Sequence, residues 1–82
     1  MAGERWEEAV LAYKQALKDD PFNLSLQSKY ILARERAAGM YAERGRVFLR
    51  EKQFDLSLEE FKRALALEPS SGEYQAGFQE AI

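Results

Sequence analysis

The chain has 82 residues with a formal net charge of −2, and it contains no cysteine and no histidine. The missing residue types exclude disulfides, thiolate metal sites, and the side chain most often used as general base and zinc ligand. The negative charge argues against nucleic-acid binding, and no apolar run approaches the ~18 residues of a membrane span. We therefore expect no cofactor, no metal site and no direct membrane insertion.

Residues 4–21 are predicted to form a first helix that ends at Asp20-Pro21. Proline disfavours the helical conformation in the residue before it, so the helix stops there. Asn23 or Ser25 is expected to cap the next helix by accepting a backbone hydrogen bond. The apolar residues recur in steps of three and four, which is the spacing of one helical face. They are Trp6, Ala9, Val10, Tyr13, Ala16 and Leu17.

Residues 24–52 contain no proline, and we predict that they form one helix of about 29 residues and about 43 Å. Gly39 costs about 1 kcal/mol relative to alanine in a helix interior, so it is also the place where the helix would kink or break in two. Leu32 falls on the polar side, either exposed or covered by something outside this chain. The segment carries seven basic and three acidic residues, whereas the rest of the chain is acidic. This basic helix either complements its own acidic neighbours or docks an acidic partner.

Two shorter helices are predicted to follow, over residues 54–68 and 72–82. Lys52-Gln53 is the tight turn before the first of them, and Glu68-Pro69 ends it. A serine of Ser70-Ser71-Gly72 can cap the last helix. No segment alternates with a period of two, so the fold class is all-α. We expect a single domain over residues 1–82.

Two segments of the chain align with each other, one before Pro21 and one before Pro69. In each copy an aromatic residue is followed by a small residue, an aromatic residue, an alanine and an acid-proline pair at the same spacing. The small residue allows a close helix approach, and the second aromatic residue lies on the same face. The copies are Trp6, Ala9, Tyr13, Ala16 and Pro21, then Phe54, Ser57, Phe61, Ala64 and Pro69.

These landmarks resemble the second helix of the tetratricopeptide repeat. Tyr41-x-x-Arg44-Gly45-x-x-Phe48 is similar to the first-helix pattern W-x-x-L-G-x-x-Y of that family, with arginine in place of leucine. The resemblance implies about one and a half repeats of helical hairpins, with Gly45 as the small contact residue inside the complete hairpin. Ser57 departs from the alanine that the family carries there.

The spacing of the two copies departs from the family. Pro21 and Pro69 are 48 residues apart, whereas successive repeats of this family lie 34 apart. The extra residues amount to about four helical turns. They lengthen the central helix, and the residues after them still point in nearly the same direction. A half-repeat followed by such an elongated, alanine- and arginine-rich helix resembles the repeat segments of some bacterial secretin-like secretion proteins. The compartment stays open between the cytoplasm and, for a secretin-like parent, the bacterial periplasm.

The resemblance implies a protein-interaction scaffold whose first helices bind a peptide or a partner helix, and the basic charge of residues 24–52 would suit an acidic one. The corresponding surface residues are Gly39, Ala42, Glu43, Arg46, Leu49 and Arg50. The alternative is a structural spacer or a self-association segment of a larger secretion-type protein, and we expect the isolated chain to form a homodimer. An enzyme is the least favoured reading, because the carboxylates that would serve, such as Glu43 or Glu59, are equally explained as solvated helix faces.

Overall fold

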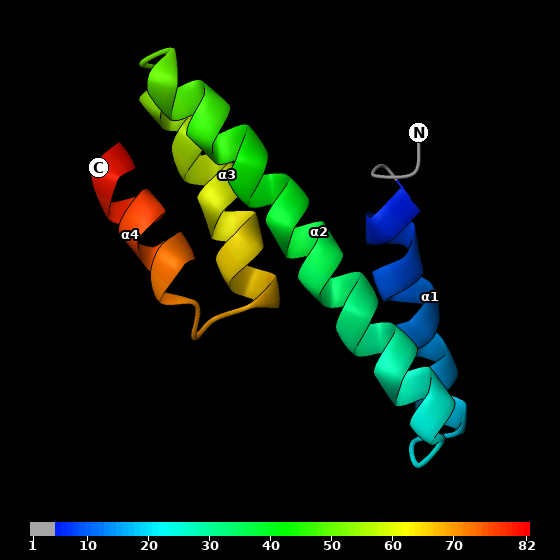
Figure 1. The fold of residues 1–82 in the computed structure, drawn as a ribbon. Helices are drawn as coiled ribbons and strands as arrows, with labels where there is room; N and C mark the ends of the chain where they lie inside the picture. The colour runs from blue at the N-terminus through cyan, green and yellow to red at the C-terminus, as the bar shows by residue number, and fades with distance from the viewer. Residues whose placement is uncertain (1–4) are drawn as a thin grey trace. The chain divides into compact units, whose positions relative to one another are not determined.

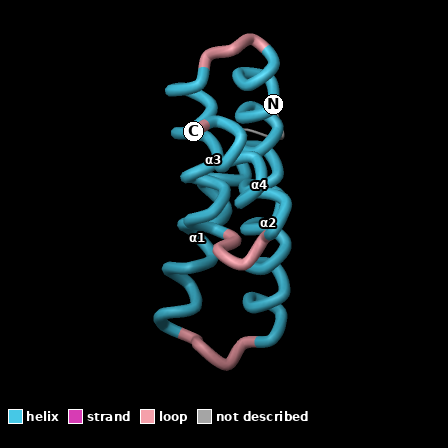
Figure 2. The backbone as a smooth tube through the Cα atoms, turned by 90° about the vertical axis from the view of Figure 1, so that its left-hand side faces the viewer, coloured by secondary structure: helices cyan, strands magenta, loops and turns pink. Residues whose placement is uncertain are grey.

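The structure is a computed structural model that describes residues 5–82, and within them it contains helices and no strand (Figure 1). The all-α prediction is confirmed. Glu4, where the first helix was expected to begin, lies outside the described residues. The helices are α1 (Trp6–Asp19), α2 (Leu24–Arg50), α3 (Phe54–Leu67) and α4 (Gly72–Ala81). Figure 2 shows the turns that connect them.

α2 is continuous through Gly39, but it ends at Arg50 and not at the expected Lys52. Lys52 adopts a positive φ of 61°. The backbone N–H of Lys52 donates to Leu49 at 3.1 Å, and that of Gln53 donates to Phe48 at 2.8 Å. These two bonds are the Schellman arrangement, which closes a helix around one left-handed residue. Sequence reasoning missed this end because the left-handed residue is usually glycine.

The chain divides into two compact units, residues 1–37 and residues 38–82. Among the described residues of the first unit, α1 and the first half of α2 bury Val10, Ala33 and Ala37. Two of these three residues are alanines, which allow helix backbones to approach closely.

The second unit consists of the second half of α2 with α3 and α4, and Phe61 lies at its centre. Its buried core is Ala38, Ala42, Phe61 and Ala64, with Tyr41, Leu67, Tyr74 and Phe78 packed against it. A Cβ atom placed on Gly45 of α2 would lie 2.8 Å from the Phe61 ring, and one on Gly77 of α4 would lie 2.4 Å from it. The two glycines therefore make room for one aromatic ring between α2 and α4.

Three hydrogen bonds stabilise the turn between α1 and α2. The backbone N–H of Asn23 donates to Asp20 at 3.2 Å. The Oδ1 atom of Asn23 accepts from the N–H of Leu26 at 3.0 Å. The side-chain amide of Gln27 donates to the carbonyl of Pro21 at 2.8 Å. Asn23 is thus the N-cap of α2, and the alternative cap Ser25 makes no such bond.

The turn between α3 and α4 repeats these contacts 48 residues further along the chain. The N–H of Ser71 donates to Glu68 at 3.2 Å. The Oγ atom of Ser71 accepts from the N–H of Tyr74 at 3.2 Å. The side-chain amide of Gln75 donates to Pro69 at 3.0 Å. The same helix–turn–helix junction therefore occurs twice, once in each unit.

Candidate functional site

The residues predicted to meet a partner all lie on the second half of α2, within the unit of residues 38–82. Ala42 does not belong on that surface, because its side chain is 0% exposed and lies in the core with Phe61. Glu43 and Arg50 are exposed, and Gly39, Arg46 and Leu49 are partly exposed. The surface has one further member on α4, Glu73. We call this set the α2–α4 surface: Gly39, Glu43, Arg46, Leu49, Arg50 and Glu73.

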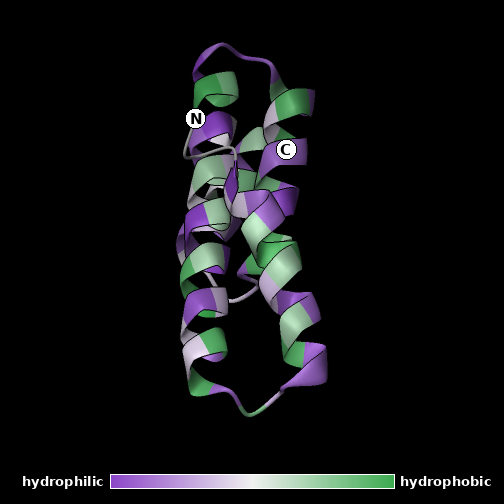
Figure 3. Ribbon diagram, turned by 90° about the vertical axis from the view of Figure 1, so that its right-hand side faces the viewer, coloured by the Kyte–Doolittle hydropathy of each residue, from purple (hydrophilic) through white to green (hydrophobic). Residues whose placement is uncertain are grey.

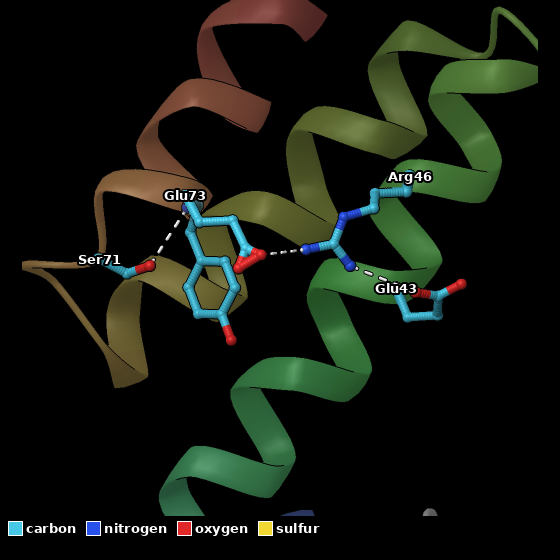
Figure 4. Close-up of polar contacts among 5 residues, drawn as sticks. Glu43, Arg46, Ser71 and Glu73 are labelled. Atoms are coloured by element: carbon cyan, nitrogen blue, oxygen red, sulfur yellow. Dashed lines mark hydrogen bonds and ion pairs between the residues drawn. The ribbon is translucent and has the colours of Figure 1, made fainter.

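Arg46 joins the two helices of this surface (Figure 4). Its Nη2 atom lies 2.8 Å from Oε2 of Glu73, and its Nη1 atom lies 3.2 Å from Oε2 of Glu43. The Arg46 side chain is 37% exposed and each carboxylate is 65% exposed. The Ser71 cap fixes the start of α4, and this start places Glu73 in the first turn opposite α2. No sequence pattern indicates this pairing, because the two residues lie on different helices.

The charge of the α2–α4 surface differs from that of α2 taken alone. Two carboxylates share the single guanidinium of Arg46, so these three residues together carry −1. Among the described residues, no ion pair involves Arg50, which is exposed one helical turn further on. The surface therefore offers fixed carboxylates beside one unpaired arginine.

Gly39 leaves space at one end of this surface. A Cβ atom on Gly39 would have the Tyr74 hydroxyl as a neighbour at 3.9 Å, an ordinary van der Waals distance. The glycine is therefore not needed for close packing at this point, in contrast to Gly45.

A second polar cluster, which includes Arg44, joins α2 to α3. Glu60 is buried, with 8% exposure. Its Oε2 atom accepts from Nη1 of Arg63 at 3.1 Å, and its Oε1 atom lies 3.9 Å from Nη1 of Arg44. Both guanidinium groups lie about 6 Å from the centre of the Tyr41 ring. Arg44, which stands where the tetratricopeptide pattern that the sequence resembles has leucine, thus contacts a buried carboxylate.

The remaining residues of the predicted repeat motif lie in both units. Ser57 is fully buried, and its hydroxyl donates to the carbonyl of Gly45 at 2.8 Å. Phe54 is 45% exposed and lines a shallow hollow of about 370 Å³ at the α2–α3 turn. Phe61 and Ala64 are buried, Tyr41 and Phe48 are partly buried, and Pro21 and Pro69 are exposed. In α1 the residues Trp6, Ala9, Tyr13 and Ala16 are only partly buried.

The carboxylates considered for catalysis both lie on exposed helix faces. Glu43 pairs with Arg46, and Glu59 lies 3.9 Å from Nζ of Lys62. Within residues 5–82, no group of three or more acidic side chains is arranged to hold a metal ion. None of the described helices combines the length and the apolarity that crossing a membrane requires.

Comparison of the chain with family models, with curated proteins and with solved structures finds no match.

Proposed function

We propose that this chain is a protein–protein interaction module of the tetratricopeptide type, and that it binds a peptide or a helix of a partner protein on the α2–α4 surface. The observation that carries the proposal is the helix–turn–helix junction that occurs twice with the same hydrogen bonds. Repeated hairpins of this kind bury their apolar faces against neighbouring hairpins and expose extended surfaces to partners.

The packing of the second unit supports the same assignment. Gly45 and Phe61 occupy the small and aromatic positions of the family pattern, and they are in direct contact. Ser57 takes the position of the usual alanine, and its hydroxyl is satisfied by the Gly45 carbonyl. The departures at Ser57 and Arg44 are therefore compatible with a family-like hairpin.

The charges of the α2–α4 surface support a polar mode of recognition. Glu43 and Glu73 hold Arg46 in place, and Arg50 remains available for an acidic group of the partner. We propose no catalytic, cofactor-dependent or nucleic-acid-binding role. The alternative is a spacer or self-association segment of a larger protein, and in a secretin-like parent it would work in the bacterial periplasm.

Capture from cell extract with the full chain as bait tests the proposal. The informative bait is Arg50→Glu, because it reverses the unpaired cation without touching the Arg46 pairs. The matched control is Lys62→Glu on α3, which reverses a cation that is also exposed but lies outside the α2–α4 surface. The proposal predicts a protein that is captured by the wild type and by Lys62→Glu and is lost with Arg50→Glu. Equal capture by all three baits would contradict it.

A further inference from the structure

The chain contains the same helix–turn–helix twice, so each residue of one copy can be compared with its equivalent in the other. Residue n of α1 and the start of α2 corresponds to residue n + 48 of α3 and α4, as the matching caps and amide contacts show. This register also makes Ala33 the equivalent of Ala81, and both are buried. The same helix face can therefore be compared in two settings within one molecule.

In the second copy, the second half of α2 covers one face of α3. The Ser57 hydroxyl donates to the carbonyl of Gly45 at 2.8 Å, and a Cβ atom on Gly45 would lie 2.8 Å from the Phe61 ring. The Oε1 atom of Glu60 lies 3.9 Å from Nη1 of Arg44. The covering helix comes this close because its contact residue is glycine. The buried residues of the covered face are Ser57, Glu60, Phe61 and Ala64.

The equivalent face of α1 is not covered in this way. We call it the α1 face, and its residues are Ala9, Ala12, Tyr13 and Ala16. Ala12 is exposed and the other three are only partly buried, whereas all four of their equivalents in α3 are buried. Figure 3 shows hydrophobic segments on the ribbon of α1 among hydrophilic ones. The α1 face thus has the shape of a helix contact, and α3 shows what such a face binds in this molecule.

The two faces differ in charge at one position. Glu60 of α3 is a buried carboxylate, and Arg44 of the covering helix is one of its ion-pair partners. Its equivalent in α1 is Ala12, which offers a methyl group and no carboxylate. An arginine held against Ala12 would lose water without gaining an ion pair, whereas an apolar side chain would gain from burial. The α1 face therefore favours a helix with an apolar residue where α2 has Arg44.

We propose that the α1 face binds a helix of a partner protein, which presents a small residue to Tyr13 and, one position earlier, an apolar residue to Ala12. The small residue takes the place that Gly45 has against Phe61. The helix of this chain that carries Gly45 is already engaged, because Gly45 accepts from Ser57 and packs on Phe61. The occupant is therefore a helix of a different protein and not a second copy. The α1 face belongs to the first unit, so the inference goes beyond the proposed function and does not depend on it.

Binding of synthetic peptides to the full chain, followed by fluorescence anisotropy, tests the proposal. The probe is a labelled peptide of residues 38–52 with Arg44→Leu, and the comparison peptide keeps Arg44. The probe should bind saturably, with one peptide per chain, and at least about 10-fold more tightly than the comparison peptide, because leucine then faces Ala12. Adding Gly45→Leu to the probe should weaken its binding at least about 10-fold, because the larger side chain keeps the two helices apart.

A carboxylate on the α1 face should reverse the preference between the two peptides. Ala12→Glu reproduces Glu60, so this chain should bind the peptide with Arg44 more tightly than the probe. Leu11→Glu is the matched control, because it adds the same charge at a position that is 68% exposed and points about 100° away from Ala12. It should leave the preference for the probe unchanged. Both variants should keep the helical circular dichroism of the wild type, since both positions are exposed.

Several results would overturn the proposal. They are a probe that does not bind saturably, a probe that binds equally well with Gly45→Leu, and a preference that Ala12→Glu leaves unchanged. A preference that Leu11→Glu reverses as strongly as Ala12→Glu would also overturn it, because the added charge would then act without contact at the α1 face. Capture through the α2–α4 surface is measured with Arg50→Glu and can fail or succeed independently of these peptides.

Discussion

Gly45 of α2 and Phe61 of α3 are in such close contact that a Cβ atom on the glycine would lie 2.8 Å from the ring. Gly45→Leu should therefore force the two helices apart and lower the free energy of unfolding by about 1–3 kcal/mol. Gly72→Ala is the control, since a Cβ atom there meets nothing within 4 Å. Thermal or urea melts followed by circular dichroism measure both. A Gly45→Leu variant as stable as the wild type would show that the contact is not formed.

Gly39→Ala, in contrast, should raise the free energy of unfolding. The nearest neighbour of the added methyl group is the Tyr74 hydroxyl at 3.9 Å, so no overlap arises. Alanine is favoured over glycine in a helix interior by about 1 kcal/mol, and we expect stabilisation of up to that amount. Destabilisation in the same melts would mean that α2 needs a break at Gly39, as one reading of the sequence allowed.

Lys52→Gly should also stabilise the fold. A non-glycine residue in the left-handed conformation destabilises the folded state by roughly 1–2 kcal/mol. Glycine removes this strain, but it also makes the unfolded chain more flexible, and this offsets part of the gain. We expect a net gain of about 0.5–1 kcal/mol. Lys52→Ala, which removes the same charge without relieving the backbone, should show no gain. If the alanine and glycine variants gain equally, the positive φ of 61° is not the cause.

Two alanine variants can decide whether Asn23 or Ser25 caps the N-terminus of α2. Asn23→Ala removes the bond to the Leu26 N–H and should cost about 1 kcal/mol. Ser25→Ala should change the stability by less than about 0.5 kcal/mol, because its exposed side chain makes no capping bond. The reverse order in urea melts would assign the cap to Ser25.

The sequence predicts the helices well because their signals are local. The apolar spacing places α1 and α3, the two acid-proline pairs end them, and Asn23 and Ser71 are short polar residues at the cap positions. The exception is the end of α2, where a lysine takes the left-handed conformation that normally signals glycine.

The candidate site is predicted less well, because it depends on contacts between helices. Arg46 and Glu73 are 27 residues apart, and no periodic pattern pairs them. The resemblance to the repeat family predicts Ala42 on the partner surface, and this is wrong because its side chain is buried in the core with Phe61. Glu60 likewise appears as one more acidic residue on a helix until the burial beside Arg44 is known.

Site-specific photocrosslinking can decide whether a partner protein binds on the α2–α4 surface. A photoreactive amino acid replaces Glu43 in the full chain, and a matched one replaces Lys62; both positions are exposed. We expect a crosslink from position 43 to one other protein, reduced by Arg50→Glu, and none to that protein from position 62. Equal crosslinking from both positions, or crosslinking from position 43 only to a second copy of the chain, would contradict it.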